Sequence, residues 1–342
     1  MPVPLLRLPK TVLRLTVSSM ELLDSLTFGL CSEKSRKLIA SLELQWHCAC
    51  IHFEETPSFV IAFPISKKLI MHLNSTRAAR NAGLITEIQV DSVDAEFGIH
   101  DELGHLHGNV TRRNTWTKPE WSFEDWAEFV IEIFGMKFGT ISFAITSQIY
   151  NLASLKLQLQ DLHGNVVVVQ DECPKEYHRM VYDTFQPLNG TSISSNPYPN
   201  SVSFQGLLLQ NFSYLELHNT CPVALEELLI TNSKNLELYN CTSITTKDIN
   251  RFIRLWQKCS NCAMMLMEIR IPVGEVFEIE KVLKETGYQK APEEREREMR
   301  NDKYVKYAVT GGYDVRGKNG RRATVKIDLK DGGQCLEFHV WP

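Results

Sequence analysis

Residues 205–256, QGLLLQNFSYLELHNTCPVALEELLITNSKNLELYNCTSITTKDINRFIRLW, contain the internal repeat that decides the fold. Two segments within this stretch, 214–219 (YLELHN) and 235–241 (NLELYNC), alternate apolar and polar side chains and begin 21 residues apart. Successive side chains of a strand point to opposite faces, so each segment presents two leucines to one side. The spacing is typical of leucine-rich repeats, in which strands alternate with helices and successive turns stack. Residues 265–270 (MLMEIR) predict a third strand.

The interval after the second strand predicts a helix. Thr245 and Asp248 have the spacing of a capping box, in which the hydroxyl accepts from a first-turn amide and the carboxylate favours the positive helix end. Apolar residues then recur at helical spacing and form one stripe: Ile249, Phe252, Ile253 and Trp256. We expect this stripe to cover the strands as core, whatever the domain binds.

The composition is that of a globular protein. A chain of 342 residues, 43% of them hydrophobic and 23% charged, is long enough for two or three units with a large core. Its 37 basic and 41 acidic side chains leave a formal charge of -4. This balance argues against broad electrostatic binding to nucleic acid or to an anionic membrane, and it leaves a protein partner or a small ligand open.

The cysteines and the first residues indicate an intracellular location. An odd count of 9 cysteines argues against a complete disulfide framework and favours a reducing compartment. Prolines at positions 2, 4 and 9 and charges at 7, 10 and 14 interrupt the apolar run that a signal peptide needs. No stretch approaches the roughly 18–20 apolar residues of a membrane-spanning helix. We therefore expect a cytoplasmic or nuclear protein.

Residues 1–45 predict a small helical module. Short helices are expected at 12–17, 20–30 and 32–44, after an extended segment that ends at Pro9. About 40 residues seldom sustain a core alone. The apolar side chains also exceed what so small a bundle can bury, and they include Leu5, Leu6, Leu8, Leu22, Leu23 and Leu26. We infer that a partner covers part of them.

This module resembles the F-box, in the form found in the large nematode family of F-box proteins. The matching positions are Leu8-Pro9, Val12-Leu13-Arg14, Met20-Glu21, and Leu30-Cys31-Ser32 with the basic residues after them. Two departures are Leu22, where the family usually has proline, and Leu15-Thr16, where an acidic residue and isoleucine are usual. The resemblance implies binding to a Skp-type adaptor, and through it to a cullin. The contact residues that it implies are Leu5, Leu8, Pro9, Val12, Leu13, Leu23 and Leu26.

The next segments hold two groups of potential metal ligands. Residues 46–63 predict a β-hairpin with Cys48 and Cys50 on one strand face, where they could ligate a soft metal, but no second pair lies nearby. Residues 64–115 are polar and irregular, and they include His100, Asp101, Glu102, His105 and His107. These imidazoles and carboxylates would suit a zinc-dependent hydrolase. Their spacing fits no helical pair and the segment contains Gly104 and Gly108, so we favour a solvated loop.

Regular secondary structure is predicted again after Pro119. A helix capped by Ser122 and ended by Gly135 is expected first. Strands are then predicted at 137–145, 152–159 and 166–170, and residues 186–203 predict a loop rich in Asn, Ser, Pro and Gly. Because a helix is again followed by a strand, residues 116–170 are interpreted as degenerate turns of the same solenoid.

The repeat region has a second resemblance, to the F-box associated domain, type 2, which follows the F-box in the same nematode family. The matching points are Gln210-Asn211-Phe212, residues 228–233 (LLITNS), and residues 248–252 (DINRF) with Trp256. This resemblance implies a domain that recruits the protein to be modified. Solenoids commonly bind through the exposed positions of their strands, here Glu216, His218, Glu237 and Tyr239, although the same residues also fit plain soluble surface.

The C-terminal residues predict a cap for the solenoid. A helix is expected within 273–287, and the mixed-charge run 293–298 (EERERE) is interpreted as a solvated helix end. Strands at 304–313, 323–329 and 335–341, with glycine-containing turns between them, predict an antiparallel meander. Such a meander would cover the apolar end that an open solenoid leaves bare.

Together these patterns predict an α/β protein: a small N-terminal helical F-box, an irregular leucine-rich-repeat-like α/β solenoid, and a C-terminal antiparallel β meander. The expected domains are 1–45 (F-box), 46–190 (first part of the solenoid), 191–275 (F-box associated) and 276–342 (charged helix and meander). The expected function is that of a non-catalytic substrate adaptor of a Skp/cullin/F-box ubiquitin ligase, with no catalytic, metal or cofactor residues. The alternatives are a scaffold that binds the adaptor without a ligase role, and the hydrolase using His100, His105 and His107.

Overall fold

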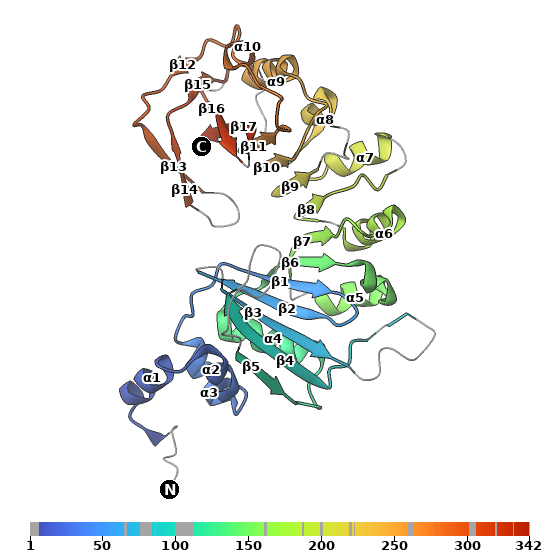
Figure 1. Ribbon diagram of the computed structural model, residues 1–342, viewed down its shortest axis with the longest axis vertical. Coiled ribbons are helices and arrows are strands. Elements are labelled where there is room, and N and C mark those ends of the chain that lie inside the picture. Colours follow the sequence, from blue (N-terminus) through green and yellow to red (C-terminus); the bar gives the residue numbers. More distant parts are fainter. Residues whose placement is uncertain are drawn as a thin grey trace. The chain divides into compact units, whose positions relative to one another are not determined.

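The chain forms two mixed α/β units, residues 1–166 (unit 1) and 167–342 (unit 2) (Figure 1). The computed structural model describes residues 7–64, 67–75, 84–85, 87–99, 112–160, 163–186, 188–198, 201–218, 221, 223–258, 263–300, 306–318, 320–330 and 332–341. In this described part, none of the helices has the length and hydrophobicity that crossing a membrane would require.

Unit 1 combines helices with an antiparallel sheet. Its helices are α1 (Lys10–Ser18), α2 (Leu22–Gly29), α3 (Glu33–Ala40), α4 (Phe123–Phe134), the 3-10 helix η2 (Ile145–Ile149) and α5 (Leu152–Leu159). Its strands, in sheet order, are β6 (Phe138–Phe143), β1 (Cys48–Phe53), β2 (Ser58–Phe63), β3 (Lys67–Asn74), β4 (Ser92–Ile99) and β5 (Arg112–Trp116). β6 runs parallel to β1, and the other neighbouring pairs are antiparallel. The predicted hairpin at 46–63 is confirmed as β1 and β2.

Helix α4 supplies the aromatic core of unit 1. Its first turn is closed by the capping box of Ser122 and Asp125, and Gly135 ends it in a left-handed conformation, with φ of 62°. Phe123 at its start packs against rings from both strands of the hairpin, with centroids 6.2 Å from Phe53 and 5.4 Å from Phe59. The sequence prediction of this helix is confirmed at both ends.

The N-terminal helices are fastened to the rest of unit 1. Arg36 of α3 pairs with Glu132 of α4 at 3.2 Å. The indole Nε1 of Trp116, in β5, donates to Thr27 Oγ1 of α2 at 3.0 Å. Arg112 of β5 also pairs with two carboxylates of the α2 region, one of them Asp24 at 3.0 Å. Ion pairs and hydrogen bonds therefore hold the N-terminal helices against α4 and the sheet.

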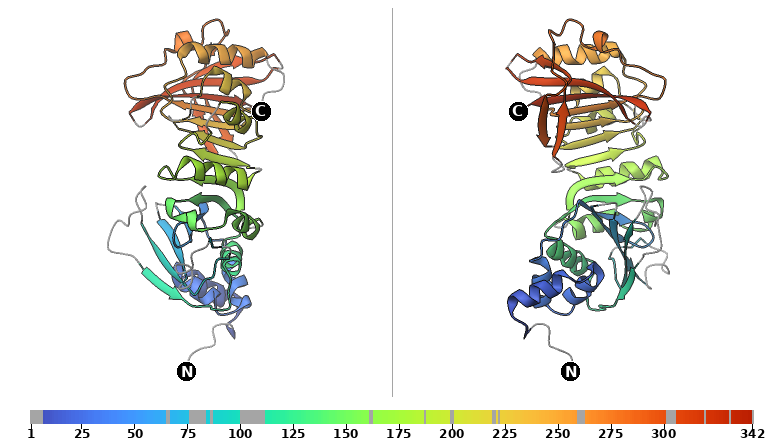
Figure 2. Two further views of the ribbon diagram at one scale, coloured as in Figure 1. Left: turned by 90° about the vertical axis from the view of Figure 1, so that its right-hand side faces the viewer. Right: turned by 60° about the vertical axis from the view of Figure 1, so that its left-hand side comes forward.

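Unit 2 begins with a parallel layer. Its elements are β7 (His163–Val169), α6 (Lys175–Phe185), β8 (Gly190–Ile193), α7 (Ser201–Leu208), β9 (Tyr214–Leu217), α8 (Leu225–Ile230), β10 (Asn235–Leu238), α9 (Thr246–Lys258) and β11 (Leu266–Arg270). Strands β8 to β11 pair in chain order and in parallel. Helices α7, α8 and α9 lie on one face of these strands (Figure 1, Figure 2). The three strands predicted from the repeat are confirmed.

The layer continues into an antiparallel meander, as predicted. β17 (Gly333–Trp341) pairs with β11, and beyond it lie β16 (Arg322–Lys330), β15 (Tyr313–Arg316) and β12 (Gln289–Lys290). β13 (Glu296–Arg300) and β14 (Lys306–Thr310) form a separate hairpin, so the strand predicted at 304–313 lies outside the meander and β15 takes its place. α10 (Ile279–Val282) is a short helix. The meander packs on α9, since the rings of Trp256 and Phe338 meet edge-on at 5.0 Å.

The alternating leucines form the core of the parallel layer. Leu215, Leu217, Leu236 and Leu238 are all at most 1% exposed. The stripe of α9 is buried as well, and its predicted cap is present: Thr245 Oγ1 accepts from the Asp248 amide at 3.3 Å while the Asp248 carboxylate accepts from the Thr245 amide at 3.0 Å. The alternating leucines of the strands and the helical stripe of α9 are therefore both buried, and this shared burial holds the strands and the helix together.

Residues 152–159 are a helix, so the predicted strand there is wrong. The segment LASLKLQL alternates in part, but it contains no β-branched residue, and leucine, alanine, lysine and glutamine are strong helix formers. The Asn151 side chain accepts from the Ser154 amide and caps the helix. Leu152, Leu155 and Leu159 are buried at helical spacing.

Four other local predictions are also wrong. The segment 64–115 contains β3, β4 and β5, and β3 buries Leu69, Met71 and Leu73 in strand alternation. The loop expected at 186–203 contains β8 and the start of α7. The helix expected at 273–287 is limited to α10. The run 293–298 leads into β13, with the Arg295 guanidinium paired to Asp314 at 2.5 Å.

Replacing Leu236 by alanine should lower the free energy of unfolding of unit 2 by about 2–5 kcal/mol, because it leaves a cavity under the helices. Urea unfolding followed by circular dichroism measures the loss. The matched control is Leu229→Ala in α8, where the side chain is 45% exposed and the change should be within about 0.5 kcal/mol. Equal losses in the two variants would contradict the packing described here.

Candidate binding surfaces

A row of glutamates crosses the polar face of the unit 2 strands. Glu216 of β9 pairs in register with Glu237 of β10, which pairs with Glu268 of β11, which pairs with Glu337 of β17. Each lies between two apolar residues that point to the opposite face. We call these four carboxylates the glutamate row.

Like charges directly opposite one another destabilise a sheet, so the row needs compensation. Glu216 accepts from His218 Nε2 at 2.8 Å, and Glu268 accepts from Arg270 Nε at 2.7 Å. Lys330 lies between two members of the row, with Nζ 3.2 Å from Glu268 and 2.5 Å from Glu337. The row is therefore part of an alternating ion-pair network across the sheet.

The network sets the ionisation of its members. Burial alone would raise the pKa of Glu337, but hydrogen bonds from His339 and Lys330 outweigh it and lower that pKa to about 2. Burial likewise opposes ionisation of Glu216, yet hydrogen bonds from His218 and Tyr214 hold its pKa below the usual value. The hydrogen bond to Glu216 in turn raises the pKa of His218.

Planar side chains stack beside the row. The imidazole of His218 stacks on the ring of Tyr239, with centroids 5.1 Å apart and planes 14° apart, and the Arg270 guanidinium lies 4.5 Å from the centroid of the same ring. The Tyr239 hydroxyl donates to Glu237 at 3.0 Å. The structure thus brings together the four residues that the sequence singled out on these strands: Glu216, His218, Glu237 and Tyr239.

Sequence reasoning missed the other half of this face. Glu268, Arg270, Lys330 and Glu337 complete the network, and they come from β11 and the meander. A sequence motif marks all four row positions: a glutamate between two large apolar residues, as in LEL, LEL, MEI and LEF. The antiparallel β17 lies far along the chain from β11, so its place in the row could not be read from spacing.

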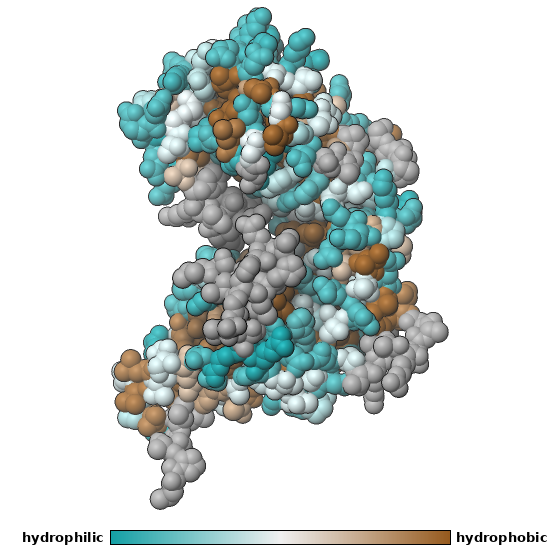
Figure 3. Space-filling view, viewed as in Figure 1, coloured by the Kyte–Doolittle hydropathy of each residue, from teal (hydrophilic) through white to brown (hydrophobic). Residues whose placement is uncertain are grey.

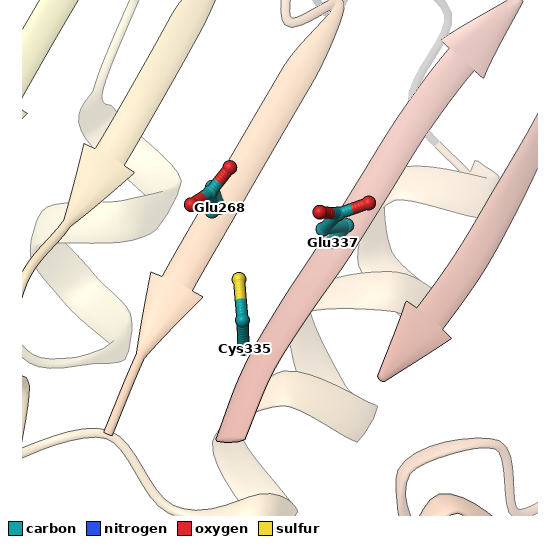
Figure 4. A group of neighbouring side chains, drawn as sticks. All are labelled: Glu268, Cys335 and Glu337. Carbon is teal, nitrogen blue, oxygen red and sulfur yellow. The ribbon is translucent and has the colours of Figure 1, made fainter. Parts of the chain in front are cut away.

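Glu268, Cys335 and Glu337 form the group with metal-ligand character in the described chain. Their potential ligand atoms lie within 4.8 Å of one another, with the thiol of Cys335 between the two strands (Figure 4). Lys330 already contacts both carboxylates, and Arg270 contacts Glu268. Burial raises the pKa of the Cys335 thiol, which opposes the thiolate that a metal needs. The arrangement fits an internal ion-pair network better than a metal site.

Unit 1 exposes apolar residues on α1. Val12 is 46% exposed and Leu15 is 68% exposed, and apolar surface gathers over this helix (Figure 3). Of the residues expected to contact an adaptor, Pro9 is also exposed and Leu8 is half-buried. Leu13, Leu23 and Leu26 are buried inside unit 1, and Leu5 lies outside the described residues. The sheet and α4 thus cover part of the apolar excess that the sequence assigned to a partner.

A groove of 720 Å³ adjoins the exposed side of α1. Its walls come from α1, α2, the segment after α3, and strands β2 and β4, and the apolar residues include Leu15, Met20, Leu22, Leu42, Leu44, Phe63 and Phe97. The Phe63 and Phe97 rings meet edge-on at 5.6 Å. All of these walls belong to unit 1.

The sequence named two other groups of potential metal ligands. His100, Asp101, Glu102, His105 and His107 lie outside the described residues. Cys48 is exposed and Cys50 half-buried, on one face of β1.

Residues 203–269 match the family model described as F-box associated. The match contains β9, β10 and α9, and with them Glu216, His218, Glu237 and Tyr239. Neither a curated protein nor a solved structure matches this chain. Unit 2 therefore contains an F-box associated domain, and this part of the sequence resemblance is confirmed.

The pair of His218 and Glu216 should make stability depend on pH. The lowered pKa of Glu216 gives stabilisation that is complete above its unfolded value of 4.5, and the raised pKa of His218 gives stabilisation that is complete below 6.5 and lost at higher pH. His218→Gln should therefore lose most stability between these values, by up to about 1 kcal/mol. Urea unfolding at several pH values measures it.

The exposed His47 provides the matched control, since His47→Gln should show no such maximum. In Glu216→Gln, an NMR titration should find a lower pKa for His218. An unchanged His218 pKa in that variant would contradict the assigned pair.

Proposed function

We propose that this chain is a substrate adaptor of a Skp/cullin/F-box ubiquitin ligase. The observation that carries the proposal is the F-box associated match at 203–269, in a chain whose N-terminal helices resemble an F-box. In this proposal the helices bind a Skp-type adaptor and unit 2 recruits the protein to be modified. The chain itself is non-catalytic and acts in the cytoplasm or nucleus.

The exposed side of α1 supports the adaptor-binding half of the proposal. Val12 and Leu15 are apolar and solvent-exposed, and the groove beside them is lined mainly by apolar residues. Apolar surface of this kind is a common feature of protein interfaces. Leu13, Leu23 and Leu26, being buried, would act by shaping the helices rather than by direct contact.

The strand face of unit 2 supports the target-binding half. The stack of His218, Tyr239 and Arg270 presents planar groups held by hydrogen bonds, so little side-chain freedom remains to be lost on binding. Tyrosine and arginine are also enriched among residues that dominate binding energy. In this proposal the parallel strands and their helices form a short, repeat-like solenoid whose polar face contacts the target.

A scaffold without a ligase role is the second candidate, and one observation favours it. α2 begins at Leu22, the position where the F-box family usually has proline, and its N-cap residue Glu21 makes no side-chain capping bond. A weaker helix start could weaken adaptor binding. Co-purification of a cullin with the full chain separates the two, because the scaffold would bring none.

Val12→Asp should weaken binding to a Skp-type adaptor by about 30-fold, because a carboxylate would be placed in an apolar interface. Isothermal titration calorimetry with the purified adaptor measures this. Leu157→Asp is the control, since Leu157 of α5 is also an exposed apolar residue, at 70% against 46% for Val12, and this variant should bind as wild type. Wild-type affinity in Val12→Asp would overturn the adaptor assignment.

Tyr239→Ala should abolish recruitment of the target while leaving adaptor binding unchanged. Proximity labelling under proteasome inhibition, with the wild type and the variant compared, identifies the proteins that depend on this face. Tyr288→Ala is the control, because Tyr288 is 41% exposed elsewhere in unit 2. An identical set of labelled proteins in all three chains would contradict the assignment of the strand face.

A further inference from the structure

Cys48 and Cys50 lie on the same face of β1, at the beginning of the strand. Residues two apart in a strand point to the same side, and their Cα atoms are about 6.4–6.8 Å apart. Disulfides join cysteines whose Cα atoms are about 4.4–6.8 Å apart, so the pair is at the upper end of that range. Cys48 is exposed, whereas Cys50 is half-buried.

The contacts of the pair give the two sulfurs different roles. The thiols hydrogen-bond one another, and this bond, together with burial, raises the pKa of Cys50. Cys50 therefore keeps its proton, and it has a second hydrogen-bond partner in Thr140 of β6. Lys68 of β3 adds positive charge beside the pair, since it lies opposite Ala62, which in turn lies opposite Cys48. Cys48 is thus the more exposed of the two sulfurs and the one that an oxidant reaches first.

We propose that Cys48 and Cys50 form a reversible intrastrand disulfide, which makes the start of β1 an oxidative modification site of this protein. The proposal is independent of the function proposed above. It concerns two residues that neither binding surface uses.

The chemistry balances with hydrogen peroxide as the oxidant. The Cys48 thiolate attacks one peroxide oxygen, the O–O bond breaks, and with one proton taken up the products are Cys48 sulfenic acid and water. The Cys50 sulfur then attacks the Cys48 sulfur, the S–O bond breaks, and the departing hydroxide takes the Cys50 proton to form a second water. The two sulfurs together lose two electrons, and the peroxide gains them.

The position of the two cysteines at the start of β1 allows the disulfide to form and also makes it easy to reduce. The sulfurs can join only if the backbone bends, because disulfide Cβ atoms lie about 3.5–4.5 Å apart. Cys48 is the first residue of β1, so the bend disturbs the start of the pairing with β2 and the first pair with β6, Cys50 with Thr140. Strained disulfides are readily reduced, so two glutathione molecules would restore both thiols and leave as glutathione disulfide.

Peptide mapping tests the proposal directly. Tryptic cleavage after Lys37 and Lys67 releases residues 38–67, which contain Cys48 and Cys50 and no other cysteine. After the folded full-length protein is treated with hydrogen peroxide and its remaining thiols are alkylated, this peptide should lose two hydrogens and carry no alkyl group. Glutathione added before alkylation should restore two alkylated thiols.

The variants separate a disulfide from general oxidation. Cys50→Ser should stop at Cys48 sulfenic acid, trapped by dimedone, and Cys48→Ser should leave Cys50 alkylated. Cys31, which is exposed and bonds the Thr27 carbonyl, provides an internal comparison for peroxide exposure. The proposal is overturned if Cys31 is oxidised while residues 38–67 keep two free thiols, or if the loss of two hydrogens requires prior unfolding.

Discussion

Strand register is the constraint on which unit 2 depends. Leu215 pairs with Leu236 and Leu217 pairs with Leu238, and all four side chains are buried beneath helices. A slip of one residue would turn the leucines outward and direct glutamates into that apolar layer. The burial that holds the strands in register therefore also aligns the glutamate row. The same alternation of apolar and polar residues thus provides both the core of the layer and the side chains of its polar face, and a change of register would disrupt both.

The N-terminal helices illustrate how a small element obtains a core. A bundle of this size has too little interior of its own. Here α2 and α3 rest on α4 and on the edge of the sheet, and their polar contacts involve Arg36, Trp116 and Arg112. Buried Leu23 and Leu26 show that much of the apolar excess is covered from within the chain. The apolar side chains that stay exposed on α1, Val12 and Leu15, are therefore the better evidence for a binding partner.

The sequence predicts elements well where one periodicity dominates. The capped helices α4 and α9 and the strands β9 and β10 have both a clear period and a clear boundary residue. Residues 152–159 mislead because leucines alternate there without β-branched neighbours, so helix propensity and the Asn151 cap decide the outcome. Half of the polar face was predictable from the repeat. The other half depends on pairing between β11 and β17, a long-range contact that no local pattern encodes.

The same long-range pairing has a consequence for how the protein is synthesised. As the chain leaves the ribosome, β8 to β11 can assemble with their helices one after another, in the order in which they are made. The outer edge of β11 then has no neighbour until β17 emerges, after the rest of the meander. An uncovered strand edge can pair with another chain. Translation speed across the meander thus sets how long each nascent molecule is exposed to aggregation.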